Sequence, residues 1–268
     1  MSIAGAAELA IKEGDTQGAL RLLSEQVRAH PQDARLRVFL FQLLCVLGQW
    51  QRAQNQLVVA GELDASTLAM VQTYREAIQC EQLRQDVFLG KRAPLLFGEP
   101  ETWVALLIEA MLREGQGAVE DAAKLRAQAF EQAPSSSGSI DGKPFAWIAD
   151  ADMRLGPVLE AVINGRYYWV PMVHLAQVEI EPPTDLRDCV WTAAQLTFTN
   201  GGGTVALIPT RYAGTDLAQA DLALARKTEW NEPQPGFYAG VGQRIFTTDA
   251  GDFGLMDVRA IIFDAADT

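Results

Sequence analysis

Residues recur at an interval of 34 positions near the start of this 268-residue chain. Each of the two copies contains two short segments with apolar residues at helical spacing, separated by a glycine. This interval is the period of tetratricopeptide (TPR) repeats, in which helical hairpins stack against one another. Most of the large consensus residues of that repeat are absent, so the pattern predicts a TPR-like stack. The matching pairs are Gly14 and Gly48, Leu9 and Leu43, Ala19 and Ala53, and Leu23 and Leu57.

The helical pattern continues beyond the two repeats. Residues 66–89 predict one long helix, which ends before Gly90. Residues 101–112 and 119–132 predict a further hairpin, with the glycines at 115 and 117 in its turn. We therefore predict a TPR-like α-helical domain over residues 1–133. Such a stack is equally consistent with a groove that receives a peptide or helix and with a plain scaffold.

The periodicity changes after a segment rich in proline, serine and glycine, which predicts a linker over residues 134–144. Beyond it, short runs of β-branched and aromatic residues predict strands, and Asn200–Gly203 predicts a hairpin turn between two of them. We also expect a short helix from Gly156 to Ile163 and a longer one from Asp216 to Thr228. Residues 145–268 are thus predicted to form an α+β domain with a mostly antiparallel sheet. The predicted strands are 167–171, 174–180, 195–199, 204–208 and 258–263.

The composition excludes several classes of partner. The net charge is −12, and no basic stripe with interleaved aromatic residues offsets it, so nucleic acid is a poor candidate partner. No apolar run reaches the roughly 20 residues of a membrane span. The first residues carry no basic segment, so we expect no secretory signal and a cytoplasmic location. The three cysteines, Cys45, Cys80 and Cys189, are widely spaced and predict reduced thiols.

No set of residues with the pattern of a catalytic or metal site is evident. The chain has only two histidines, His30 and His174, and no motif surrounds them or the cysteines. Asp150-Ala-Asp152 has too few oxygen ligands to define a cation site, and we expect these acids to pair with Arg154 or cap a helix. Neither glycine-rich segment has the spacing of a phosphate or dinucleotide loop. We predict no enzymatic activity, no metal and no cofactor.

Arginine and aspartate residues occur close to tryptophans in the second half. Buried charges are costly unless they are paired, so one interpretation is an internal ion-pair network that holds loops to the sheet. The other is a recognition surface, because arginine and tryptophan are enriched in binding hot spots. An enzyme or small-ligand-binding module built on the same cluster is the alternative function. The candidate partner-binding residues are Arg154, Arg187, Asp188, Trp191 and Trp230, with Arg244, Trp147 and Trp169 nearby.

Several blocks of the second half, in the same order, resemble the ImpE/TagJ family, also called SciE-type virulence proteins. The helical first half is compatible with that family but less distinctive. The blocks are Asp152-x-Arg-Leu-Gly-Pro-Val-x-Glu160, Gly165-x-Tyr-x-Trp-Val-Pro171, Pro183-x-x-Leu-Arg-Asp-x-x-Trp191, Leu207-Ile-Pro-x-Arg-Tyr212, Glu229-Trp230 and Gly242-Gln-Arg244.

The resemblance implies a non-enzymatic accessory protein of a bacterial type VI secretion system. Members of the family are associated with TssB, the small subunit of the contractile sheath, and bind its N-terminal helix. Through this subunit they are linked to ClpV, the ATPase that recycles the sheath. The resemblance supplies no catalytic residues, and it assigns the partner-binding role to no position of this chain.

Overall fold

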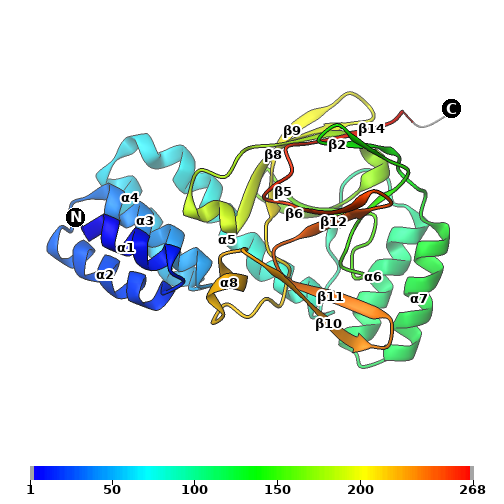
Figure 1. Ribbon diagram of the computed structural model, residues 1–268, viewed down its shortest axis with the longest axis horizontal. Helices are drawn as coiled ribbons and strands as arrows, with labels where there is room; N and C mark the ends of the chain where they lie inside the picture. The colour runs from blue at the N-terminus through cyan, green and yellow to red at the C-terminus, as the bar shows by residue number, and fades with distance from the viewer. Residues whose placement is uncertain (1–2, 266–268) are drawn as a thin grey trace.

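The first half of the chain forms paired helices, as the 34-residue repeat predicts. The computed structural model describes residues 3–265, and Figure 1 shows the helices α1 to α4 gathered at one end of the molecule. No helix within these residues combines the length and apolarity needed to cross a bilayer. The long helices are α1 (Ile3–Lys12), α2 (Thr16–Ala29), α3 (Ala34–Val46), α4 (Trp50–Leu63), α5 (Leu68–Phe88), α6 (Thr102–Gly115) and α7 (Val119–Gln132).

Aspartate side chains cap the starts of helices in the hairpins, and glycines form the turns between them. The Asp15 carboxylate accepts a 2.7 Å hydrogen bond from the backbone N–H of Gly18, and so caps the start of α2. Asp33 caps α3 in the same way, through the N–H of Arg35 at 2.9 Å. Gly48 turns the chain between α3 and α4 with φ of +65°, a conformation that residues with a Cβ rarely adopt. The repeat therefore recurs because each hairpin needs the same turn.

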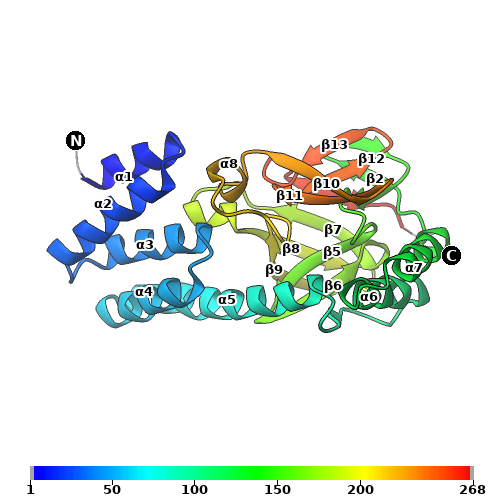
Figure 2. The same cartoon turned by 90° about the horizontal axis from the view of Figure 1, so that it is seen from below.

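Helix α5 joins the two ends of the molecule. The helix has 21 residues. Figure 2 shows it running along the sheet from the α1–α4 end to the α6–α7 hairpin. The long helix predicted over residues 66–89 is thus confirmed. At its far end, Gly90 lies against α6 so closely that a Cβ there would come 2.7 Å from the Cα of Gly115. The predicted hairpin of α6 and α7 follows this crossing.

The second half is built on a nine-stranded sheet in the order β1-β6-β5-β9-β8-β7-β14-β2-β3. All of its pairings are antiparallel except that of β1 with β6, which confirms the mostly antiparallel α+β fold. Its strands are β1 (Leu95–Leu96), β2 (Gly138–Ile140), β3 (Lys143–Phe145), β5 (Val158–Ile163), β6 (Arg166–Pro171), β7 (Leu175–Ile180), β8 (Trp191–Phe198), β9 (Gly203–Pro209) and β14 (Ala260–Phe263).

Two small sheets and a few short helices complete the second half. One small sheet has the order β13-β12-β4 and the other is the hairpin of β10 with β11. These elements are β4 (Ile148–Asp150), β10 (Thr228–Gln234), β11 (Phe237–Gly242), β12 (Ile245–Thr248), β13 (Gly251–Gly254), α8 (Ala220–Ala223) and the 3-10 turns η2 (Met172–His174) and η3 (Leu186–Cys189). A further 3-10 turn, η1 (Ala65–Thr67), lies in the first half between α4 and α5.

Apolar side chains fill both faces of the large sheet. One buried cluster runs without a break from α1 through α5 to the sheet face that carries Val158, Trp169 and Trp191. The second cluster covers the opposite face, where Leu159 and Val170 meet Phe246 of β12. The helices and one face of the sheet thus share one hydrophobic core. Each large apolar side chain that is buried there stabilises the fold by about 1.5–3 kcal/mol.

The helix predicted from Gly156 to Ile163 is wrong. Residues Val158–Ile163 form strand β5, in which all six side chains are buried. Adjacent residues of a strand point to opposite faces, and here both faces are covered, so the run is apolar except at Glu160 rather than alternating. A short continuous apolar run does not distinguish a buried strand from a helix.

The longer helix predicted from Asp216 to Thr228 is also wrong, because only the four residues of α8 are helical. Ala225, two residues after the last helical residue, adopts φ of +52°, so the helix does not continue beyond α8.

The predicted linker over 134–144 contains β2 and the start of β3, and both pair into the large sheet. The segment is therefore no free tether, and the domain boundary remains a prediction.

Two arginines of the second half bind the ends of helices in the first half. Arg226 donates to the carbonyl of Ile11 at 2.8 Å, close to the end of α1. Arg211 donates through Nη1 to the carbonyl of Val46 at 2.7 Å, and through Nη2 to that of Cys45 at 3.3 Å, at the end of α3. Ile11 and Cys45 are equivalent positions of the 34-residue repeat. Cations are favourable at helix C-termini, where free carbonyls carry partial negative charge.

We expect Arg211→Met to lower the free energy of unfolding by about 2 kcal/mol. Arg211 is 5% exposed and also donates to Ala223, so its loss removes hydrogen bonds to three carbonyls, of which only that of Cys45 keeps another donor, the backbone N–H of Gly48. Arg226→Met is the matched control and should lower the free energy of unfolding less, since the Arg226 side chain is 37% exposed. Denaturant unfolding followed by circular dichroism measures both. Equal losses in the two variants would contradict this assignment.

Candidate functional site

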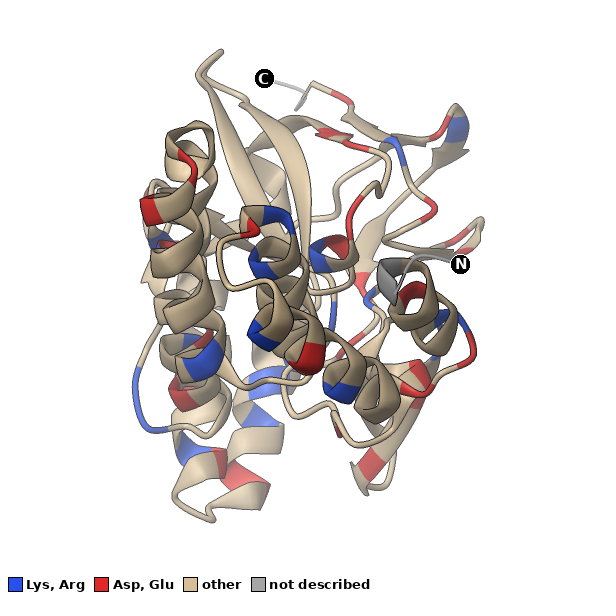
Figure 3. Ribbon diagram, turned by 90° about the vertical axis from the view of Figure 1, so that its left-hand side faces the viewer, with Lys and Arg blue, Asp and Glu red and all other residues tan. Residues whose placement is uncertain are grey.

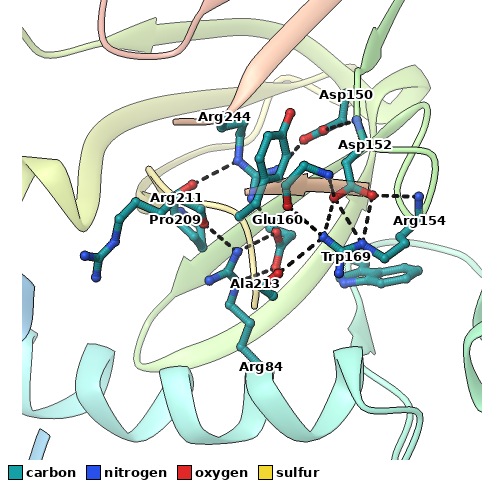
Figure 4. Close-up of polar contacts among 12 residues, drawn as sticks. Arg84, Asp150, Asp152, Arg154, Glu160, Trp169, Pro209, Arg211, Ala213 and Arg244 are labelled. Atoms are coloured by element: carbon teal, nitrogen blue, oxygen red, sulfur yellow. Dashed lines mark hydrogen bonds and ion pairs between the residues drawn. The ribbon is translucent and has the colours of Figure 1, made fainter. Parts of the chain in front are cut away.

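A buried carboxylate, Glu160, lies at the centre of the charged cluster. It projects from β5 and is fully buried. Arg84 of α5 binds it with two bonds, Nε to Oε1 at 2.7 Å and Nη2 to Oε2 at 3.1 Å. Arg244 binds Oε2 from the other side, and the Tyr167 hydroxyl donates to Oε1. Figure 4 shows Glu160 between these two arginines, each of which comes from a different part of the chain.

Arg244 continues the network towards Asp150. Its Nη1 contacts the Asp150 carboxylate, and its Nε donates to the carbonyl of Pro209 at 2.9 Å. Neither side chain of this pair is exposed to solvent. Arg244 directly precedes β12 in the chain, whereas Asp150 ends β4 and Pro209 ends β9. One guanidinium thus joins three segments that lie far apart in the sequence.

Asp152 and Arg154 form the third part of the network. The Arg154 Nε donates to the Asp152 carboxylate at 2.9 Å, and its Nη2 donates to the carbonyls of Ala213 and Gly240. Asp152 also accepts from the backbone N–H of Gly240 at 3.0 Å. The pairing of the Asp152 carboxylate with Arg154 was expected from the sequence. Three arginines, at 84, 154 and 244, thus face three acids, at 150, 152 and 160, and Arg84 also contacts a fourth, Glu81.

The two central carboxylates respond differently to burial. Burial alone raises the pKa of a carboxyl group, and it raises that of Asp150 to about 7 despite the opposing effect of Arg244. Burial acts on Glu160 too, but the charges of Arg84 and Arg244 outweigh it and lower the pKa of Glu160 to about 2. Glu160 is therefore ionised at neutral pH, and it anchors the network.

The structure separates the five candidate partner-binding residues. Arg154 belongs to the network. Trp191 is fully buried, and its ring nitrogen donates to Glu81 at 3.0 Å, so it lines no exposed surface. Trp230 is 42% exposed on the β10–β11 hairpin and contacts the ring of Tyr212.

The remaining two candidates, Arg187 and Asp188, shape the loop that precedes β8. Asp188 accepts from the backbone N–H groups of Thr184 and Asp185, each at 2.7 Å. Arg187 pairs with the Asp185 carboxylate and lies over the ring of Tyr74 at 4.9 Å. These contacts fix the conformation of the loop and hold it against α5.

The partners Arg84 and Glu160 were not predicted as site residues. Glu160 stands alone among apolar residues in the run Val158–Ile163, and an isolated acid in such a run indicates a buried, paired charge. Arg84 is one of many polar residues on α5, and its partner is 76 residues further along the chain. Nothing local to Arg84 identifies it.

The side chains of the described residues favour no nucleophilic or metal chemistry. The three cysteines are free, and burial raises the pKa of Cys80 to about 12 and also raises the pKa values of Cys45 and Cys189. Thiols with raised pKa values are protonated at neutral pH and react poorly. His174 lies beside Glu101, with Nε2 3.2 Å from Oε1. Residues 3–265 contain no cluster of three potential metal ligands.

Several hollows lie where the halves of the chain meet, and two of them border the features described above. A cavity of about 450 Å³ borders the network and is lined by Arg84, Arg154 and Arg211 among others. A larger groove of about 650 Å³ lies between the helices α1 and α3 and the loop at residues 184–186. Both combine residues from the helical half with residues from the sheet half.

Comparison with known proteins identifies the family. The model of the "ImpE protein" family matches residues 142–262, and that of a tetratricopeptide repeat family matches residues 10–77. A protein of Pseudomonas aeruginosa, named type VI secretion system accessory component TagJ, is 53% identical over 267 residues, covering 99% of this chain and 94% of its own. The chain belongs to the ImpE/TagJ family. The family predicted from the sequence blocks is thus confirmed.

A crystal structure supports the same fold for this ImpE/TagJ protein. The protein VPA1032 of Vibrio parahaemolyticus superposes with a TM-score of 0.88 and 26% sequence identity, over 97% of each chain. Most of the network lies in the blocks that carry the family resemblance, from Asp152–Glu160 to Gly242–Arg244. These blocks therefore converge on a buried structural cluster in this chain.

We expect Glu160→Gln to lower the free energy of unfolding by about 3–5 kcal/mol at pH 7, because it leaves Arg84 and Arg244 buried without their shared carboxylate. Glu179→Gln, on the exposed side of β7, is the matched control and should change stability little. Denaturant unfolding at several pH values measures both variants.

The same variant should change the response to acid. Because the pKa of Glu160 is lowered in the folded protein, its stabilising contribution is complete above about pH 4.5 and is lost as the pH falls towards about 2. The stability difference between the unaltered protein and Glu160→Gln should therefore shrink over that range. A difference that stays constant from pH 7 to pH 3 would show that Glu160 is not the ionised anchor.

Proposed function

We propose that this protein is a non-enzymatic accessory component of a bacterial type VI secretion system that works in the cytoplasm by binding another protein. The observation that carries the proposal is the 53% identity with the accessory component TagJ of P. aeruginosa over nearly the whole chain. The TPR-like helices support a binding role, because stacked helical hairpins present extended surfaces to partners. The charged cluster is consistent with a non-enzymatic role, because its arginines and acids bind one another rather than facing a substrate.

We further propose that the partner is the N-terminal helix of TssB, the small sheath subunit, and that this contact links the protein to sheath assembly or to ClpV-dependent recycling. An amphipathic helix binds by placing its apolar stripe in a hydrophobic groove, while charges at the rim set its orientation. The groove of about 650 Å³ beside α1 and α3 is of the kind that such a helix requires.

Titration calorimetry tests this function directly. The full-length protein is titrated with a synthetic peptide of the N-terminal TssB helix encoded in the same genome. A peptide of the same composition in scrambled order is the control, because it keeps the charge but loses the apolar stripe. We expect saturable binding of the first peptide only. No heat with either peptide, together with no co-purification of TssB with the protein, would refute the proposal.

A further inference from the structure

The groove beside α1 and α3 is formed by both halves of the chain. Its helical wall carries Ile11 of α1 and Leu36 and Phe39 of α3. Its opposite wall is Thr184–Leu186, a loop of the sheet half. Ile11 is buried at 8% exposure, and the other apolar groups, Leu186 included, are partly buried and pack on the shared core. The floor is therefore apolar and firmly supported.

The sheet-side wall is held in one conformation. The Asp188 carboxylate accepts the N–H groups of Thr184 and Asp185, and Asp185 in turn accepts the backbone N–H of Asp188, which forms a capping box. Arg187 pairs with Asp185 and lies over Tyr74 of α5. A preorganised wall lowers the entropy lost on binding. Arg187 and Asp188 thus act as positioning residues for the groove.

The rim of the groove is acidic on balance. Glu8 and Asp64 line it with the cation Arg35, and the third acid, Asp185, is already paired with Arg187. Figure 3 looks onto this end of the molecule, where acidic and basic positions are interspersed along the helices. A ligand with an apolar stripe flanked by lysine or arginine would match both the floor and the rim.

The other hollows and faces fit such a ligand less well. The cavity of about 450 Å³ is lined by Arg84 and Arg154, whose charges are already paired with acids. On the β8–β9 hairpin, Val205 is 67% exposed but lies opposite Gln195 in the register. An isolated apolar side chain among polar ones offers no apolar stripe.

We infer that an amphipathic helix with basic residues beside its apolar stripe binds in this composite groove, between α1 and α3 on one side and Thr184–Leu186 on the other. This inference rests on the proposed function, which supplies the TssB helix as the probe. It adds the place of binding and the charge of the ligand, and it gives the segment before β8 the role of a binding wall.

Two groove variants and two matched controls test the inference by calorimetry with the TssB peptide. Phe39→Ala removes a ring from the floor, and Glu8→Lys reverses a charge on the exposed rim. Val58→Ala and Glu25→Lys make comparable changes on α4 and α2, at exposed positions that do not line the groove. Thermal unfolding checks that all four variants remain folded.

We expect Phe39→Ala to weaken binding about tenfold or more, as for a hot-spot residue. Glu8→Lys should weaken it several-fold at low salt and less at high salt, because salt screens charges at an exposed rim. Glu8→Lys also serves if Phe39→Ala fails to fold, and both controls should bind like the unaltered protein. Undiminished binding by Glu8→Lys and by folded Phe39→Ala would overturn the groove but leave the proposed function standing. No binding by the unaltered protein would overturn both.

Discussion

The bidentate contact between Arg84 and Glu160 is the interaction on which the rest of the structure depends. It joins the C-terminal part of α5 to the middle of β5, and the two residues are 76 positions apart. Both groups are buried, so each would be costly without the other. The same carboxylate also binds Arg244, which holds β4 and the end of β9. The position of α5 across the sheet therefore follows from one ionised side chain.

Because α5 continues the helical stack, its attachment to the sheet also orients the stack. Arg211 and Arg226 then bind equivalent carbonyls at the ends of α3 and α1, so each repeat is held separately. A shared apolar core reinforces these contacts. The two halves thus form a composite unit in which a groove between them keeps its shape. A protein that binds a helix in such a groove loses less conformational entropy on binding than a flexible pair of domains would.

Sequence reasoning predicted the features that depend on local pattern. The 34-residue repeat predicted the hairpins because each one needs the same glycine turn, and short runs of β-branched and aromatic residues predicted strands such as β7 and β9. It failed at β5, where both faces are covered, and at residues 216–228, where Ala225 leaves the helical conformation. The family blocks identified the protein, yet Trp191 in one of them is fully buried. The contact of Arg84 with Glu160 joins residues 76 positions apart, and no pattern near Arg84 predicts it. The pair could therefore be identified only from the structure.

Most of the family blocks build a buried scaffold, whereas we propose that recognition takes place in the composite groove, one wall of which belongs to the block Pro183–Trp191. Hydrogen–deuterium exchange of the full-length protein, with and without the TssB helix peptide, tests it most directly. We expect the peptide to slow exchange in α1, in α3 and in the segment around residues 184–188. We expect no change in the β10–β11 hairpin that carries Trp230. Protection confined to that hairpin or to the β8–β9 hairpin would refute binding in the groove.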